Sequence, residues 1–187
     1  MRKLNITEMG RMNVEQFKQS SKMPLTVVLD DVRSMYNVGS VFRTSDAFRV
    51  EKICLCGITA QPPHPEIHKT ALGAEDTVEW QYFPDTLEAV RKLQDDGCYV
   101  FSIEQCEGST MLQHLPKELE SLRLQHHYDR FAIVMGNEVK GVKQEVINLA
   151  DGCLEIPQFG TKHSLNVSTT AGIVIWEFAK LLMTANK

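Results

Sequence analysis

The order of apolar segments along this 187-residue chain is the feature that most constrains its fold. Short runs rich in β-branched and aromatic residues alternate with segments of helical periodicity. The predicted strands cover residues 25–29, 53–57, 78–83, 99–103, 130–135 and 153–156. The predicted helices cover residues 38–49, 85–97, 143–151 and 164 to about 185. Strands that alternate with helices favour an α/β fold, with a mainly parallel sheet flanked by helices on both faces.

Two segments fall outside this alternation. Residues 1–24 are predicted to form a short basic N-terminal helical arm, because they carry five basic and two acidic side chains. Residues 114–129 are predicted to be a polar connection. The net charge of −4 and the pI near 5.9 are not those of a protein coated to bind nucleic acid. The basic arm still offers a local surface for such a partner, so charge alone does not decide the question.

Composition limits where the protein works. The apolar fraction of 43% and the charged fraction of 24% are typical of a globular domain. No run approaches the roughly 18 apolar residues of a membrane span. The first residues lack the apolar region of a secretory signal. We therefore expect a cytoplasmic protein that does not associate with a membrane.

Cys54 and Cys56 are predicted to be reduced thiols. The number of cysteines, five, is odd, which argues against a complete disulfide framework. Cys54 and Cys56 lie in the apolar run ICLCG and are expected in or near a core strand. A zinc site that uses His64 or His68 is the less favoured alternative, because no second cysteine pair has the spacing of metal ligands. No metal is therefore expected.

Two polar turns follow predicted strands and contain many small residues. One lies within IPQFGTKHSLNVSTTAG at 156–172, and the other ends the strand FAIVM in GNEVKG at 136–141. The small and polar residues of these turns are Gly136, Asn137, Glu138, Gly141, Ser164, Asn166 and Ser168. Such turns expose several backbone amides at a helix entrance and can hold a polar ligand. Two turns of this kind suggest a single binding site.

A third polar turn precedes the helix predicted for residues 38–49. Asn37 is expected to cap this helix, and Gly39 leaves its first turn without a side chain. Arg43, four residues later on the same face, is expected to point back over Gly39 and to attract an anion such as an RNA phosphate. The alternative is an ordinary capped helix whose arginine pairs with an acidic neighbour, namely Asp30, Asp31 or Asp46.

The common nucleotide and hydrolase signatures are absent. No GxGxxG follows a strand, and no GxSxG elbow is present. The segment GNEVKGVK departs from a phosphate-binding loop, since Val142 and Lys143 stand where Lys and Ser or Thr are required. The polar turns therefore indicate a less common small-molecule site.

The last predicted helix is apolar almost all round from Ala171 to Met183. A stripe of Glu177, Lys180 and Thr184 is its main polar surface. A helix on the surface of a monomer buries one stripe and exposes the rest. We therefore predict a homodimer that covers the second apolar face, the alternative being a helix that is fully buried in the monomer.

Three motifs in this order resemble those of a known family. They are NVGSVFR at 37–43, VMGNEVKG at 134–141 and IPQFGTKHSLNVS at 156–168. Together with KTALGAEDTV at 69–78, they resemble the SpoU/TrmH branch of the SPOUT RNA methyltransferases over about residues 25–185. The resemblance implies a methyltransferase domain over residues 25–187, with a deep C-terminal trefoil knot in which the last helix passes through a loop. It also implies an obligate homodimer.

The same resemblance implies a cofactor and a reaction. The cofactor is S-adenosyl-L-methionine, and the reaction is methyl transfer to a ribose 2′-hydroxyl of RNA, either tRNA or rRNA. The cofactor-binding positions of the family correspond to Met135, Gly136, Asn137, Ile156, Gln158 and Leu165. Gln158 stands where the family often has Met, which makes the expected adenine pocket more polar.

The catalytic positions implied by the resemblance are Asn37, Arg43, Glu138, Ser164 and Asn166. Arg43 is expected to act from the opposite subunit on the phosphate and the developing oxyanion. We assign it electrostatic positioning rather than proton removal, because a guanidinium keeps its proton in proteins. RNA specificity is expected to depend on residues 1–24, the alternative being a surface elsewhere that the sequence does not identify. The alternative function is a non-catalytic RNA- or cofactor-binding protein of the same fold.

Overall fold

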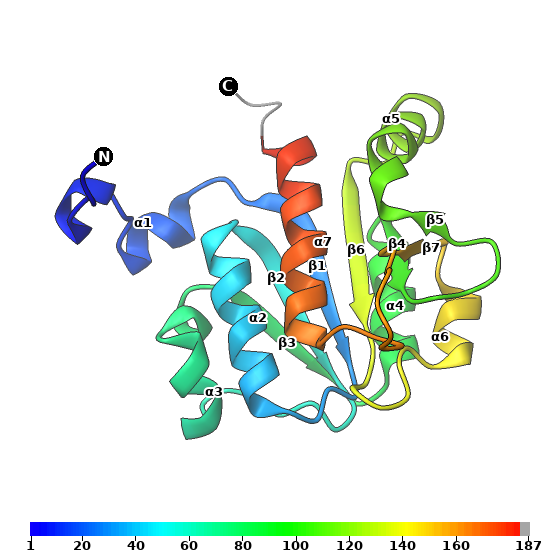
Figure 1. Ribbon diagram of the computed structural model, residues 1–187, viewed down its shortest axis with the longest axis horizontal. Coiled ribbons are helices and arrows are strands. Elements are labelled where there is room, and N and C mark those ends of the chain that lie inside the picture. The colour runs from blue at the N-terminus through cyan, green and yellow to red at the C-terminus, as the bar shows by residue number, and fades with distance from the viewer. Residues whose placement is uncertain (184–187) are drawn as a thin grey trace.

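The computed structural model describes residues 1–183, and in this part of the chain seven strands form one sheet (Figure 1). The strands are Met23–Asp30 (β1), Val50–Cys56 (β2), Glu79–Phe83 (β3), Cys98–Ile103 (β4), Thr110–Met111 (β5), Arg130–Met135 (β6) and Gly152–Glu155 (β7). Their spatial order is β3-β2-β1-β6-β4-β7-β5, and every neighbouring pair is parallel. The predicted α/β fold with a mainly parallel sheet is thus confirmed.

Helices cover both faces of the sheet (Figure 1). They are Val14–Gln19 (α1), Met35–Ala47 (α2), Pro65–Ala71 (α3), Thr86–Asp95 (α4), Leu115–His126 (α5), Gln144–Leu149 (α6) and Val167–Leu182 (α7). Short 3₁₀ turns lie at Ile6–Met9, Ala74–Asp76 and Leu112–His114. The core residues of α2, α3, α5 and α7 belong to one apolar cluster, and those of α4 and α6 belong to another.

The alternation of side chains along β1 explains the two clusters. Leu25, Val27 and Leu29 are fully buried on the face that α2 and α7 cover. Val28 points to the other face and packs in the cluster of α4 and α6. Because successive side chains of a strand point to opposite faces, a continuous apolar run indicates a strand that is covered on both sides.

The expected polar connection at residues 114–129 is wrong, since most of it forms α5. Leu115, Leu119 and Leu122 recur at helical spacing and are buried against the sheet, with 5% exposure or less. Pro116 lies in the first turn, where its missing N–H leaves no helical hydrogen bond unmade. Polar residues between these leucines face outward, which hid the helical period in the sequence.

Helix α3 was not predicted from the sequence. His64 caps this helix, because its Nδ1 accepts a hydrogen bond from the Glu66 amide at 3.1 Å. His68 on the same helix lies 2.5 Å from the carboxylate of Glu75. Both histidines considered for a zinc site therefore act within this helix and its neighbouring turn.

The helices at the two ends of the chain are shorter than the sequence predicts. Residues 1–24 contain α1, whose Phe17 is buried with 6% exposure. Helix α7 begins at Val167 rather than at residue 164, and the predicted residues 184 and 185 lie outside the described part.

Cys54 and Cys56 are free and buried, as predicted, and burial raises the pKa of Cys54 to about 12. Within the described residues, no helix is both long and apolar enough to span a bilayer.

Candidate functional site

A cavity of about 640 Å³ opens at the carboxyl edge of the sheet. Its walls come from the segments that follow β4, β6 and β7 and from the first turn of α7. Ligands of open parallel sheets bind outside the carboxyl ends of the strands, and ligand cavities typically measure roughly 300–1,000 Å³. This cavity is therefore the candidate ligand site.

Most of the residues predicted for the site line this one cavity. They are Met135, Gly136, Asn137, Glu138, Ile156, Gln158, Ser164, Leu165 and Asn166. The two polar turns around residues 136–141 and 156–168 thus meet in space. Asn37 and Arg43 lie outside the lining, on α2.

Glu138 ties the loop after β6 to the start of α2. Its carboxylate accepts hydrogen bonds from the backbone amides of Arg33 at 2.9 Å and Ser34 at 2.8 Å, and from Asn37 Nδ2 at 3.0 Å. Burial raises the pKa of Glu138, but the hydrogen bonds outweigh burial and leave the pKa below its usual value. The ionised carboxylate therefore anchors the start of α2 through charge-assisted hydrogen bonds.

Asn166 caps α7 and at the same time contacts α2. Its Oδ1 accepts hydrogen bonds from the amides of Ser168 at 2.9 Å and Thr169 at 3.3 Å. Its Nδ2 donates to Asn37 Oδ1 at 3.2 Å. Since Asn37 also donates to Glu138, one chain of hydrogen bonds joins all three polar turns.

The predicted role of Asn37 as the cap of α2 is wrong. The cap is Ser34, whose side chain accepts the Asn37 amide at 3.3 Å. Asn37 lies inside the first turn and is 9% exposed, with both side-chain atoms bonded to the other turns. Its role in the structure is to connect Glu138 with Asn166.

The predicted bare surface at Gly39 is also wrong, because α3 covers it. A β-carbon at Gly39 would lie 2.2 Å from both Ile67 O and Thr70 Oγ1. Glycine at this position therefore permits close packing of two helices. Arg43 does not point over an open surface at Gly39.

Arg43 lies instead on the exposed side of α2. Within the described part of the chain, no hydrogen bond or ion pair engages its guanidinium. The alternative in which Arg43 pairs with an acidic neighbour is not observed: Asp30 and Asp31 contact Lys143, and Asp46 accepts a hydrogen bond from a threonine that follows α3. The arginine is available to a partner outside this chain.

Lys143 fixes the end of the loop after β6. Its Nζ lies 2.7 Å from Asp31 Oδ2 and 3.3 Å from Asp30 Oδ1, and its amide donates to Asp30 Oδ2 at 3.2 Å. Burial lowers the pKa of Lys143, but the two carboxylates raise it by more, so the pKa lies above its usual value. Lys143 thus joins the loop after β6 to the end of β1. It is one of the two residues that depart from the pattern of a phosphate-binding loop.

Asn137 shapes the loop from within. It exchanges backbone hydrogen bonds with Gly141 at 3.0 and 2.9 Å, and its Oδ1 accepts the amides of Val139 at 2.9 Å and Lys140 at 3.2 Å. Gly136 lies directly against this turn, since a β-carbon there would be 2.1 Å from backbone atoms of Gly141. The loop can keep its shape only if residue 136 has no side chain.

We therefore expect Gly136→Ala to lower the free energy of unfolding by ~2 kcal/mol or more, because backbone atoms must shift to admit the methyl group. Gly160→Ala is the matched control, since a β-carbon at Gly160 meets nothing within 4 Å. Urea unfolding of the two variants measures the difference. Equal stabilities would contradict the close approach at Gly136.

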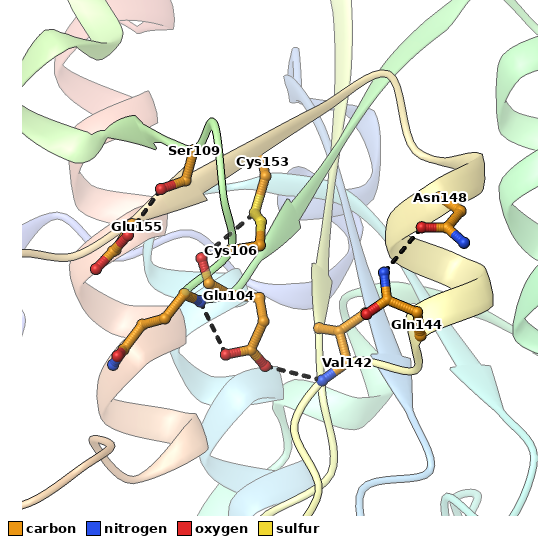
Figure 2. Close-up of a disulfide and its surroundings, with 9 residues drawn as sticks. Glu104, Cys106, Ser109, Val142, Gln144, Asn148, Cys153 and Glu155 are labelled. Carbon is orange, nitrogen blue, oxygen red and sulfur yellow. Dashed lines mark hydrogen bonds between the residues drawn. A yellow bond between two sulfur atoms is a disulfide. The ribbon is translucent and has the colours of Figure 1, made fainter.

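The segment after β4 contributes residues that the sequence did not predict for the site. Glu104, Gln105 and Cys106 line the cavity. Gln105 Nε2 donates to His163 O at 2.9 Å, which links this segment to the turn before α7. The sulfur atoms of Cys106 and Cys153 lie 2.50 Å apart beside this segment (Figure 2). The sequence contained one indication that Glu104, Gln105 and Cys106 belong to the site, namely their position after the carboxyl end of a predicted strand.

The fold and the cavity define an α/β protein with a ligand site at the carboxyl edge of a parallel sheet. The profile of the SpoU rRNA Methylase family matches residues 24–176. The chain belongs to this family.

Named relatives are similar over most of the chain. A tRNA (guanosine(18)-2′-O)-methyltransferase of Thermus thermophilus is 29% identical, over 91% of this chain and 82% of that protein. The 23S rRNA (guanosine-2′-O-)-methyltransferase RlmB of Neisseria meningitidis serogroup B is 29% identical, over 89% of this chain and 62% of that protein. The chain thus spans less than two thirds of the length of this second relative.

Solved structures share the fold. The TrmH/SpoU tRNA modifying enzyme of A. aeolicus matches with a TM-score of 0.77 and 20% identity, over 92% of this chain and 82% of that chain. An AdoMet-bound rRNA methyltransferase from Sinorhizobium meliloti matches with a TM-score of 0.73 and 25% identity, over 89% of this chain and 59% of that chain. The α/β architecture described above is therefore that of SpoU-type structures.

Proposed function

We propose that the protein is an S-adenosylmethionine-dependent RNA methyltransferase that methylates a ribose 2′-hydroxyl of tRNA or rRNA. The observation that carries the proposal is the hydrogen-bonded chain Glu138–Asn37–Asn166 beside the cavity. It connects one residue from each of the three motifs that resemble the family. Membership in the SpoU family and the names of the relatives support the same reaction.

The cavity fits the cofactor in size and chemistry. The buried side chain of Met135 and the half-exposed Leu165 provide apolar walls for a purine. The close approach of Gly136 to the backbone of Gly141 and Val142 fixes the shape of the loop that forms one wall of the cavity. Gly136, Ile156, Gln158 and Leu165 would hold the cofactor, and Asn137 would act by shaping the loop. S-adenosylmethionine supplies a methyl group already activated on a sulfonium.

The catalytic residues have distinct proposed roles. Glu138, Asn37 and Asn166 hold α2, the loop after β6 and α7 in fixed relative positions. Ser164, exposed at the cavity wall, orients the ribose hydroxyl. Arg43 binds the neighbouring phosphate and stabilises the negative charge that develops on the hydroxyl oxygen.

The proposal includes a trefoil knot and a homodimer. In the knot, α7 passes through a loop; in support, α7 follows β7 yet packs beside β1 and α2, across β4 and β6. In the dimer, a second copy covers the face formed by α2 and α7. There, Phe48 and the half-exposed Trp176 border an apolar groove of about 350 Å³. This half-exposed ring supports the dimer over the alternative of a fully buried helix.

The dimer brings the exposed Arg43 of α2 to the cavity of the partner subunit. Residues 1–24 form the basic arm proposed to contact RNA outside the catalytic site, and residues 25–187 form the methyltransferase domain. The protein is proposed to act in the cytoplasm, where its RNA substrates are found.

The test is incubation with methyl-labelled S-adenosylmethionine and total RNA from cells that lack the protein. We expect label in tRNA or rRNA, at a ribose that resists alkaline cleavage on its 3′ side because its 2′-hydroxyl is blocked. Light scattering on the same preparation should give the mass of a dimer. Cofactor binding without any methyl transfer would instead support a non-catalytic RNA- or cofactor-binding protein.

A further inference from the structure

One carboxylate in the cavity wall has no role in the chain of hydrogen bonds that joins the motifs. Glu104 follows the last residue of β4, is half-buried, and lines the cavity. Figure 2 shows its side chain turned toward the backbone of Val142, on the loop after β6. It links the segment after β4 to the loop after β6, both of which line the cavity.

The carboxylate of Glu104 is held firmly in place. Its Oε1 accepts the Gln105 amide at 2.8 Å, and its Oε2 accepts the Val142 amide at 3.0 Å. The side chain also occupies the space beside Gly141, where a β-carbon would lie 2.1 Å from Oε2. Two backbone donors and a glycine thus fix the orientation of one acidic group.

Each oxygen of Glu104 retains capacity to accept a further hydrogen bond. A carboxylate offers about four acceptor positions, and the protein uses two of them, one on each oxygen. The other acidic side chains that line the cavity are held differently, since Glu138 is bound to α2 and its preceding turn and Glu155 is bound by a side-chain hydroxyl rather than by two backbone amides. Glu138 accepts three hydrogen bonds from α2 and its preceding turn, and Glu155 accepts one from Ser109 Oγ at 2.7 Å.

Two neighbouring acceptors with fixed positions match two neighbouring donors on a ligand. The vicinal hydroxyls of a ribose have this arrangement, and acidic side chains at the carboxyl end of a strand bind ribose hydroxyls in dinucleotide-binding folds. We infer that Glu104 accepts hydrogen bonds from the 2′- and 3′-hydroxyls of the adenosine moiety of the cofactor. Glu104 is then the side chain that selects a ribonucleoside over a deoxynucleoside in this pocket.

This inference rests on the proposed function only in that the cofactor contains adenosine. Calorimetry with 5′-methylthioadenosine and its 2′,3′-dideoxy analogue tests it without any methyl transfer. We expect the wild-type protein to bind the ribose form at least about tenfold more tightly, as two hydrogen bonds to a charged group imply. In Glu104→Gln, this ratio should fall to within about threefold of unity.

The ratio separates recognition from a structural role. If Glu104 only supports the loop, Glu104→Gln weakens both ligands by the same factor and the ratio stays at its wild-type value, which overturns the inference. A loss of affinity for S-adenosylmethionine but not for methylthioadenosine would likewise overturn it, in favour of a charge effect on the sulfonium. Glu155→Gln is the matched control, and its ratio should equal that of the wild type.

The wild-type protein alone gives a second test that needs no folded variant. If it binds the two nucleosides equally, no side chain reads the hydroxyls and the inference is wrong. Methyl transfer to RNA by that same wild-type protein would leave the proposed function intact. Failure to bind any adenosine derivative would contradict both.

Discussion

Replacing Arg43 with alanine should lower kcat for methyl transfer by about 100-fold or more, as is typical when one preorganised donor to a developing oxyanion is removed. The affinity for S-adenosylmethionine should change by less than about threefold, because Arg43 does not line the cavity. Folding should also be preserved, since Arg43 is exposed and no side chain of the described residues depends on its guanidinium. Single-turnover kinetics and calorimetry measure the two quantities separately.

Two further variants define the role of Arg43. Arg43→Lys keeps the charge but loses the planar fork that binds a phosphate through two nitrogen atoms, so it should recover only part of the rate. Arg91→Ala removes the same charge from an exposed position of α4, on the opposite face of the sheet, and should behave as the wild type. Turnover at the wild-type rate in Arg43→Ala would refute this mechanism.

The parallel sheet was predictable from the sequence because a strand that is buried on both faces needs consecutive apolar residues. Strand β1 must be apolar at consecutive positions such as Val27 and Val28, which face different helices. Helix α5 was not predictable in the same way. Its buried leucines are separated by charged residues that contact solvent, so the segment as a whole has the composition of a loop.

The sequence indicated the two polar turns that line the cavity, but neither the segment after β4 nor the contacts between the turns. Glycine and asparagine in polar turns indicated a ligand site, and their order along the chain matched a family. The position of Asn37 inside α2 depends on Glu138, which is 101 residues away and holds the preceding turn. In the same way, glycine is needed at position 39 because α3 packs against it, and the sequence did not predict α3. Such contacts are decided by tertiary packing, which a single sequence does not reveal.

Asn166→Ala should reduce turnover far more than stability. The loss of the cap on α7 costs about 1 kcal/mol, which lowers Tm by roughly 2–4 °C in a chain of this size. The loss of the bond to Asn37 removes one link that positions α2 against α7 beside the cavity. We expect kcat to fall by about 100-fold, since small displacements of positioning groups have effects of this size. Thermal unfolding and single-turnover rates provide the comparison.

Asn166→Asp separates the two functions of this side chain. Aspartate keeps an oxygen that accepts the Ser168 and Thr169 amides, so the cap and Tm should be preserved. It cannot donate to Asn37 Oδ1, so the rate should stay low. If Asn166→Asp restored turnover together with Tm, Asn166 would be only a helix cap.

Mixing the Arg43→Ala and Asn166→Ala proteins then tests whether the site is shared between subunits. If Arg43 serves the partner's cavity, each mixed dimer contains one site with both residues intact. A statistical mixture of twofold-symmetric dimers should then regain about a quarter of the wild-type activity. If Arg43 acts within its own chain, every site lacks one of the two residues and the mixture stays inactive. After subunit exchange, retention of the untagged variant through an affinity tag carried by only one of the two variants confirms that mixed dimers have formed, so an inactive mixture would then contradict the shared site.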